Sequence, residues 1–332
     1  YKESDEAWVD LFQIGNTYAI DYTNSFSFLK ESNSILWASE KDGWRHLYQV
    51  SLEGKPEVLI TKGEYDVIDL KYIHNKEGFV YYLASPDNAT QKYLYKTKLN
   101  GKGKNELLSP ASLEGSHDYS FSSNGNYAAH SFSNHFTPYS KEFISISNHK
   151  ALTEEESILK NIKKIEEKPT TEFFTITTED NVELDGWMVK PTNFDPTKKY
   201  PVVFYVYSEP ARATVNDSYN TSRNSLYIGD MAEDGYIYIS LDNRGTPSPK
   251  GREWRKSIYR KIGVININDQ AMAAKEILNW DFIDSERVAV WGWSGGGSAT
   301  LNLMFQYPEI YKTGIAIAAV ANQLTYDNIY QE

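Results

Sequence analysis

The pentapeptide Gly292-Trp293-Ser294-Gly295-Gly296 carries the residues of this sequence that are best suited to chemistry. It follows an apolar run at residues 287–291 and precedes a helix-like run at residues 298–304, which is the strand-turn-helix setting of a nucleophile elbow. Glycines on both sides allow a sharp turn and leave the Ser294 hydroxyl open to a substrate carbonyl. We therefore predict that Ser294 is the nucleophile of an acyl transfer. The alternative is a tight glycine turn with a structural serine.

A serine nucleophile needs a general base, and this sequence offers no good candidate. An α/β-hydrolase presents its triad in the order Ser, Asp or Glu, then His. All six histidines precede Ser294, namely His46, His74, His117, His130, His135 and His149. We read them as surface or satisfied strand residues, and we expect no metal and no cofactor. The acid and base are expected downstream of this chain, which should be nearly inactive alone, since losing triad partners costs on the order of 10⁴ to 10⁶ in rate.

Strand-like runs alternate with helical patterns in the second half of the chain. The strand candidates are residues 173–177, 182–189, 202–206, 236–241, 288–291 and 314–320, and the helix candidates are residues 268–278 and 296–306. Strands that alternate with helices form largely parallel sheets. We predict that residues 171–332 are the N-terminal portion of an α/β-hydrolase domain, with a mostly parallel sheet, flanking helices and an incomplete C-terminal part.

The first half has a different, repeated pattern. Short runs rich in Tyr, Phe, Val and Ile alternate with turn residues, and three of them end at Ser39, Ser85 and Ser131, 46 residues apart. A period near 45 residues indicates β-propeller blades, and the alternative is a β-sandwich with coincidental spacing. We predict a partial β-propeller over residues 1–150. A linker helix should follow in residues 151–170, where Thr153 to Glu156 have the form of a capping box.

Composition excludes several classes of function. The formal net charge is −11, which disfavours nucleic acid or an anionic membrane as the main partner. There is no cysteine, so disulfides and thiolate metal sites are excluded, and no apolar run is long enough to predict a membrane span. A basic stretch at residues 250–261 is expected to be a solvated helix face.

Several motifs in the right order give the chain a family resemblance. It resembles the dipeptidyl peptidase IV branch of the prolyl oligopeptidase family of serine peptidases, in its bacterial type. The motifs are Asp42 to Tyr48, Ile60 to Gly63, Lys199 to Pro201, Tyr205 to Tyr207, Asp242 to Gly245, Asp269-Gln270, Trp291 to Ser294 and Tyr326 to Tyr330. The resemblance implies a propeller that caps a hydrolase domain and admits short peptides, and it suggests a sequence truncated at both ends.

The resemblance also assigns roles to individual residues. Ser294 would attack the scissile carbonyl, and the oxyanion would be held by the Gly295 N–H and the Tyr207 hydroxyl. Cleavage would release an N-terminal dipeptide with Pro or Ala at its second position. The proline ring would lie against Tyr326, Tyr330, Val320 and Trp293.

The sequence departs from the family pattern at two positions of that pocket. Gly295 stands where animal members usually have Tyr, and Gln323 stands where they have Trp. Both changes widen the pocket, which works against strict proline preference, and the acidic pair that binds the substrate amine has no counterpart here. The alternatives are an oligopeptidase or acylaminoacyl peptidase of the same fold and a non-catalytic peptide-binding relative. Export and a homodimer are implied by the resemblance only.

Overall fold

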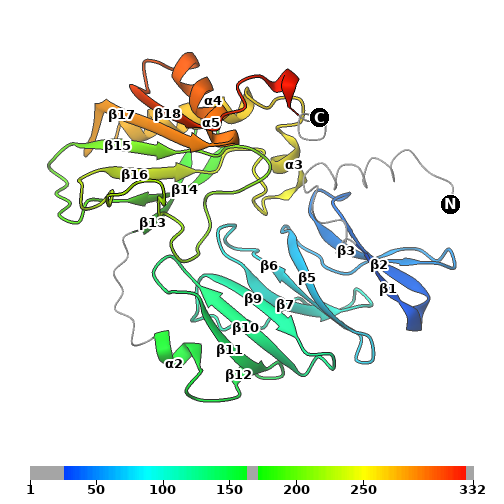
Figure 1. The fold of residues 1–332 in the computed structure, drawn as a ribbon. Helices are drawn as coiled ribbons and strands as arrows, with labels where there is room; N and C mark the ends of the chain where they lie inside the picture. The colour runs from blue at the N-terminus through cyan, green and yellow to red at the C-terminus, as the bar shows by residue number, and fades with distance from the viewer. Residues whose placement is uncertain (1–25, 163–170, 327–332) are drawn as a thin grey trace. The chain divides into compact units, whose positions relative to one another are not determined.

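The structure is a computed structural model that describes residues 26–162 and 171–326. These residues divide into two compact units, drawn in Figure 1. The first unit holds residues 26–162 and two short later segments, Asn216–Tyr219 and Pro249–Glu253. The second unit holds the rest of residues 171–326.

The first unit contains three antiparallel sheets of four strands each, and in each sheet the strands are neighbours in chain order. The first sheet comprises β1 (Phe26–Leu29), β2 (Ser34–Ser39), β3 (His46–Ser51) and β4 (Val58–Leu59), with a 3₁₀ turn at Lys30–Ser32. The second comprises β5 (Val67–His74), β6 (Phe79–Ala84), β7 (Tyr93–Lys98) and β8 (Glu106–Leu107). The third comprises β9 (Ser116–Phe121), β10 (Tyr127–Ser133), β11 (Ser140–Ser145) and β12 (Lys150–Ala151).

The 46-residue repeat corresponds to the second strand of each sheet, since the repeated runs lie at the ends of β2, β6 and β10. Alternation of side chains explains why these runs form strands. In β10, Ala128, His130 and Phe132 are buried while Ala129 and Ser131 are more exposed. Successive four-stranded sheets are the blades of a propeller, so the partial propeller is confirmed and the sandwich alternative is wrong.

The linker helix is shorter than the sequence predicted. Helix α2 (Ile158–Ile162) begins five residues after the expected cap at Thr153. Its first backbone N–H, at Ile158, is bound by the Glu142 carboxylate of β11 at 3.0 Å, and the Ile158 side chain packs on Leu113 and Phe132. A distant strand residue therefore sets the start of the helix, and the local capping box does not. The second half of the expected segment lies outside the described residues.

The second unit is built on one six-stranded sheet in the order β13-β14-β16-β15-β17-β18. The strands are β13 (Thr171–Thr177), β14 (Glu183–Val189), β15 (Tyr200–Tyr205), β16 (Ile237–Leu241), β17 (Ile283–Trp293) and β18 (Thr313–Ile317). The last four strands are mutually parallel, while β13 and β14 pair antiparallel. All five residues of β16 are buried, as expected for a strand covered on both faces. The expected α/β plan is confirmed.

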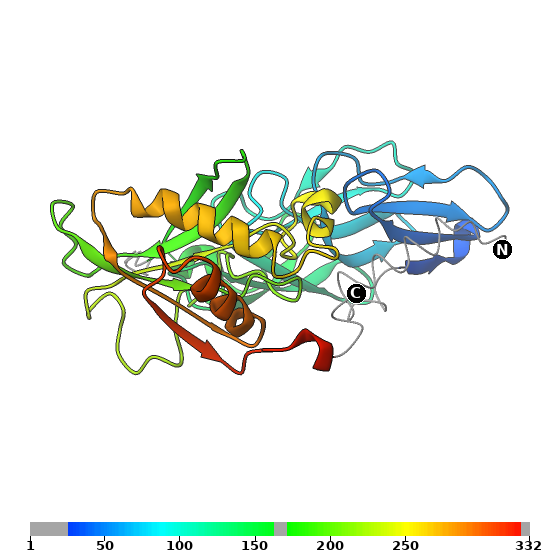
Figure 2. The same cartoon turned by 90° about the horizontal axis from the view of Figure 1, so that it is seen from above.

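Two helices cover one face of this sheet. Figure 2 shows α4 (Ile265–Leu278) and α5 (Gly295–Gln306) lying side by side on the same face. The apolar core between them and the sheet includes Val202, Phe204 and Val290. The opposite face packs in a second cluster that includes Trp187, Tyr238, Trp291, Val215 and Ala232. The sheet therefore holds the carboxyl ends of β15 and β17 in fixed register. A short 3₁₀ turn, Gln323–Thr325, follows β18.

The basic stretch forms helix α3 (Gly251–Lys256) and the turns around it. The expectation of a solvated helix face is wrong for Arg255, which is only 3% exposed and donates from Nη1 to the Ser248 carbonyl at 3.3 Å. Arg260 and Lys261 are exposed, as expected. Among the described residues, no helix is both long and apolar enough to cross a membrane.

Candidate active site

Ser294 occupies a strained turn between β17 and α5. Its backbone has φ 57° and ψ −118°, a conformation that costs a residue with a side chain of order 1–3 kcal/mol. The turn is held by a hydrogen bond from the Ser294 N–H to the Ile317 carbonyl at 2.9 Å and by the Ser298 N–H, which donates to the Ser294 carbonyl at 3.0 Å. Ser294 is half-buried at the start of α5, where the helix dipole favours negative charge. This is the geometry of a nucleophile elbow.

The elbow glycines are required by close backbone packing. A Cβ at Gly292 would lie 2.3 Å from the Gly296 carbonyl, and a Cβ at Gly296 would lie 2.1 Å from the Val206 carbonyl oxygen. A Cβ at Gly297 would lie 2.7 Å from the Ile317 carbonyl oxygen. The elbow therefore fits between the end of β15 and the end of β18 only without side chains at these positions.

Tyr207 lies beside the elbow because β15 and β17 are neighbours. The Val206 N–H donates to the Trp291 carbonyl at 3.0 Å, and the Tyr207 Cα lies 3.2 Å from the position of a Cβ on Gly296. Tyr207 is half-buried, and burial raises its pKa, with the charge of Glu209 raising it further. The phenol therefore keeps its proton at neutral pH and can donate a hydrogen bond.

Two asparagines fix the backbone that follows Tyr207. Ser208 has a positive φ of 62°. Its carbonyl accepts hydrogen bonds from Asn243 Nδ2 and Asn266 Nδ2, both at 3.2 Å, and Asn266 also donates to the Ser208 hydroxyl at 3.1 Å. Both asparagines are buried. The loop that presents Tyr207 is thus tied to the end of β16 and to the first turn of α4.

The family motifs around these asparagines have a supporting role in the structure. Gln270 donates from Nε2 to the Leu241 carbonyl at 2.8 Å and to Asn243 Oδ1 at 3.0 Å. Arg244 pairs with the fully buried carboxylate of Asp269 at 2.6 Å. The two motifs, Asp242 to Gly245 and Asp269-Gln270, therefore hold the site's second layer and do not themselves reach the elbow.

Glu209 is a residue of this site that the sequence did not indicate. Its side chain is buried, and its Oε2 lies 2.0 Å from the position that a Cβ on Gly295 would take. The carboxylate therefore occupies the space next to the nucleophile into which a side chain at position 295 would extend. The signal was the combination of Gly295 with an acidic residue two positions after Tyr207, which acquires meaning only once the fold brings them together.

A cavity of about 320 Å³ lies beside the elbow within the second unit. Its lining includes Glu209, Asn266, Asn302 and Val320. Val320 is held there by Ser298, whose hydroxyl accepts from the Val320 N–H at 3.0 Å and donates to its carbonyl at 3.1 Å. The cavity therefore combines apolar surface with one buried carboxylate.

The other predicted pocket residues lie apart from this cavity. Trp293 is 48% exposed and Tyr326 is 41% exposed. Tyr326 is close enough to Tyr207 for its charge to raise the pKa of the latter. Tyr330 lies outside the described residues.

Comparison with known proteins identifies the family. Residues 1–139 match the family model for the dipeptidyl peptidase IV N-terminal region, and residues 222–332 match the model for the prolyl oligopeptidase family. The crystal structure of Porphyromonas gingivalis dipeptidyl peptidase 4 superposes with a TM-score of 0.80 at 31% identity, over 94% of this chain and 43% of that one. The chain belongs to the dipeptidyl peptidase IV branch of the prolyl oligopeptidase family.

Curated members of the dipeptidyl peptidase IV branch give the same result. Dipeptidyl peptidase 4 of Trichophyton equinum is 29% identical over 99% of this chain, and that of Arthroderma otae is 29% identical over 94%. The chain spans 43% and 41% of the length of these two relatives. The elbow and Tyr326 both fall within the segment that matches the prolyl oligopeptidase model.

The histidines all lie in the first unit, where five of them have hydrogen-bond partners at short range. His46 contacts Thr61 Oγ1 at 3.1 Å, and His135 Nδ1 contacts Asp217 Oδ1 at 2.9 Å. His117, His130 and His149 are linked to one another and to Tyr119 and Glu142. His74 accepts a longer hydrogen bond, 3.3 Å, from the Glu77 N–H. Satisfied strand histidines are therefore what the structure contains at these positions.

Proposed function

We propose that the protein that contains this chain is a serine peptidase that removes N-terminal dipeptides with Pro or Ala in the second position. The observation that carries the proposal is the strained Ser294 turn, with the Gly295 N–H at the start of α5 and Tyr207 beside it. The names of the relatives, all dipeptidyl peptidases 4, support the substrate class. Ser294 is the nucleophile in this proposal.

The chemistry follows from where negative charge develops. When Ser294 Oγ attacks the scissile carbonyl, the carbonyl oxygen becomes an oxyanion, which the Gly295 N–H and the Tyr207 hydroxyl stabilise. A protonated, half-buried phenol is suited to this role because its donor needs no reorganisation. The general base and the acid that orients it belong to other parts of the protein, because no histidine follows Ser294 in this sequence.

Substrate selection is proposed to rest on the surfaces around the elbow. Tyr326, Tyr330, Val320 and Trp293 would contact the residue at the second position, whose rigid ring loses little entropy on binding. The wider pocket at Gly295 suits Ala as well as Pro. By analogy with the relatives we also infer that the protein is exported, acts on short peptides and forms a homodimer.

The test uses the whole protein and a Gly-Pro anilide. Ser294→Ala should abolish turnover and labelling by a fluorophosphonate, and Tyr207→Phe should lower kcat by about 10² to 10³. Tyr127→Phe, an exposed tyrosine of the first unit, is the matched control and should leave kcat unchanged. Full activity of Ser294→Ala would refute the proposal, and equal rates for the two tyrosine variants would remove Tyr207 from the oxyanion site.

A second measurement separates the dipeptidyl reading from an oligopeptidase or acylaminoacyl peptidase of the same fold. N-acetylation of the substrate should abolish cleavage if a free amine is required. Persistent cleavage of the acetylated peptide would assign the protein to one of the other two classes.

A further inference from the structure

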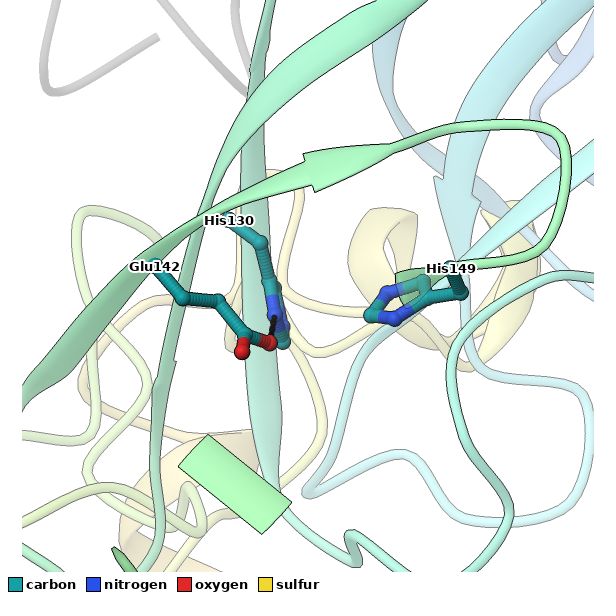
Figure 3. Close-up of side chains that lie close together, drawn as sticks. All are labelled: His130, Glu142 and His149. Carbon is teal, nitrogen blue, oxygen red and sulfur yellow. Dashed lines mark hydrogen bonds and ion pairs between the residues drawn. The ribbon is translucent and has the colours of Figure 1, made fainter. Parts of the chain in front are cut away.

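A cluster of metal-ligating side chains lies in the third blade, within the first unit. His130 of β10, Glu142 of β11 and His149 of the turn between β11 and β12 each bring one ligand atom within 4.8 Å of the other two. Figure 3 shows the three side chains converging from these separate segments. His130 is fully buried and Glu142 is 4% exposed. The cluster has no part in the proposed peptidase chemistry.

Hydrogen-bond directions leave one nitrogen of His130 facing Glu142. His117 Nε2 lies 2.8 Å from the Leu113 carbonyl, which can only accept, so this nitrogen carries a proton. Burial favours the uncharged ring, whose Nδ1 then accepts from His130 Nε2 at 2.8 Å. His130 Nδ1 and Glu142 Oε1, 2.8 Å apart, therefore share a single proton that a cation can replace.

His149 supplies the third ligand atom. Its Nδ1 is buried and makes no hydrogen bond among the described residues, while its Nε2 lies 2.8 Å from the Tyr119 hydroxyl. Its backbone has a positive φ of 51°, which histidine adopts more readily than most side chains do. One nitrogen of this ring is thus fixed from outside, and the other faces the cluster.

Each ligand has an outer partner, as ligands of protein metal sites usually do. His117 orients His130, and Tyr119, which is itself bonded to Ser109 at 2.8 Å, orients His149. The second oxygen of Glu142 accepts the Ile158 N–H at 3.0 Å. The two imidazoles and the carboxylate are therefore held by contacts that leave their inner atoms available.

We propose that His130, Glu142 and His149 bind a divalent zinc-like cation. Two histidines and one carboxylate are a ligand set of zinc, and the Glu142 charge offsets half of the charge of the ion. Bonds of about 2.0–2.1 Å in a tetrahedral site place ligand atoms about 3.4 Å apart. Because the rings of His130 and His149 meet at 78° with centroids 4.8 Å apart, binding requires His149 to turn and move inward by about 1 Å.

The experiment measures zinc binding by the whole protein after treatment with a chelator. We expect one zinc ion per chain, with a melting temperature raised by about 5 °C or more at a hundredfold excess over Kd. Co²⁺ in place of zinc should give the visible absorption of a tetrahedral site. Peptidase activity is not the readout, so failure here leaves the proposed function untouched.

His149→Asn is the decisive variant, because Asn also tolerates positive φ and keeps the turn while removing the ligand. Its zinc affinity should fall by more than about 100-fold, and Glu142→Gln, which keeps the size of the side chain, should act likewise. His74→Asn, in the second blade, is the matched control. Absence of a zinc-dependent shift in the parent protein would overturn the proposal, as would equal affinities for His149→Asn and His74→Asn.

Discussion

Glu209 and Gly295 compete for one space next to the nucleophile. The Glu209 carboxylate lies where the first side-chain atom of a larger residue at 295 would be, so each residue type permits the other. This accounts for the departure of Gly295 from the residue that is usual in animal members of the family. The wider pocket expected from Gly295 alone is filled in part by a buried carboxylate.

Gly295→Ala is expected to lower kcat/KM at least about tenfold. The new Cβ would meet Glu209 Oε2 at 2.0 Å, so either the carboxylate or the Gly295 N–H must move, and small displacements of an oxyanion donor are costly. Glu209→Ala in the same molecule should restore much of the loss. A double-mutant cycle on the whole protein would measure a coupling of about 1–3 kcal/mol.

The control for this cycle is Glu233→Ala, which removes an exposed glutamate of the same unit. It should not rescue Gly295→Ala. Additive effects of the Gly295 and Glu209 changes would contradict the competition for space.

What sequence alone predicts at this scale depends on the range of the interaction. Ser294 was predictable because the elbow is local: a strand, a turn and a helix contiguous in the chain. Tyr207 was identified only through the family resemblance, since it reaches Gly296 across two neighbouring strands. Glu209 was missed because nothing in its local sequence says that its carboxylate meets Gly295.

At the scale of elements, Asp242 ties the loop after β15 to the end of β16. Its carboxylate accepts hydrogen bonds from the N–H groups of Thr214 at 2.7 Å and Val215 at 3.1 Å, and from the Ser248 hydroxyl at 3.3 Å. Burial raises the pKa of Asp242 to about 6, and nearby Asp185 adds to the rise, although the two N–H donors oppose it. The far end of the loop that begins at Tyr207 thus depends on a titratable group.

The pH dependence has a definite sign. A carboxyl group whose pKa is higher in the folded than in the unfolded chain holds its proton more tightly when folded. Its contribution to stability is full below the unfolded value of 3.8 and is lost as the pH rises through about 6. The loss amounts to about 1.4 kcal/mol per pH unit, or about 3 kcal/mol in total.

Asp242→Asn should remove this component. Urea unfolding of the parent protein and the variant at pH 4, 5, 6 and 7 gives the difference in free energy of unfolding at each pH. We expect the variant to be less stable throughout, because the amide cannot accept both N–H groups, and we expect the difference to shrink from pH 4 to pH 6. A difference that stays constant with pH would show that Asp242 does not titrate in this range.

Elements with strong internal periodicity were predictable, and elements set by distant contacts were not. The spacing of Ser39, Ser85 and Ser131 marked the second strands of three blades because each blade repeats the same alternation. Helix α2 was placed too early because Glu142, from another strand, binds its first N–H. Arg255 was misjudged for the same reason, since its carbonyl partner at Ser248 comes from the preceding loop.

At the scale of the molecule, the chain order and the compact units do not coincide. Asn216–Tyr219 belongs to the first unit although both of its neighbouring segments belong to the second. Asp217, which is 3% exposed, anchors it. Its N–H donates to the Thr90 carbonyl at 2.7 Å, and its carboxylate accepts from the Gln91 side chain at 2.8 Å. The family resemblance predicted two domains from the sequence pattern, but a periodicity argument has no means of finding such a short return segment.

Asp217→Ala should therefore destabilise the first unit by about 2–3 kcal/mol. The His135 N–H at 2.8 Å, His135 Nδ1 at 2.9 Å and Gln91 Nε2 would all lose their acceptor in a buried setting. The free energy of unfolding of the whole protein and the rate of tryptic cleavage at Arg212 and Arg223, which flank the segment, are the measurements. Asp87→Ala, at an exposed position of the same unit, should change neither. If cleavage and stability were the same in both variants, Asp217 would be a passive neighbour of the blades, and some other contact would have to hold the segment in the first unit.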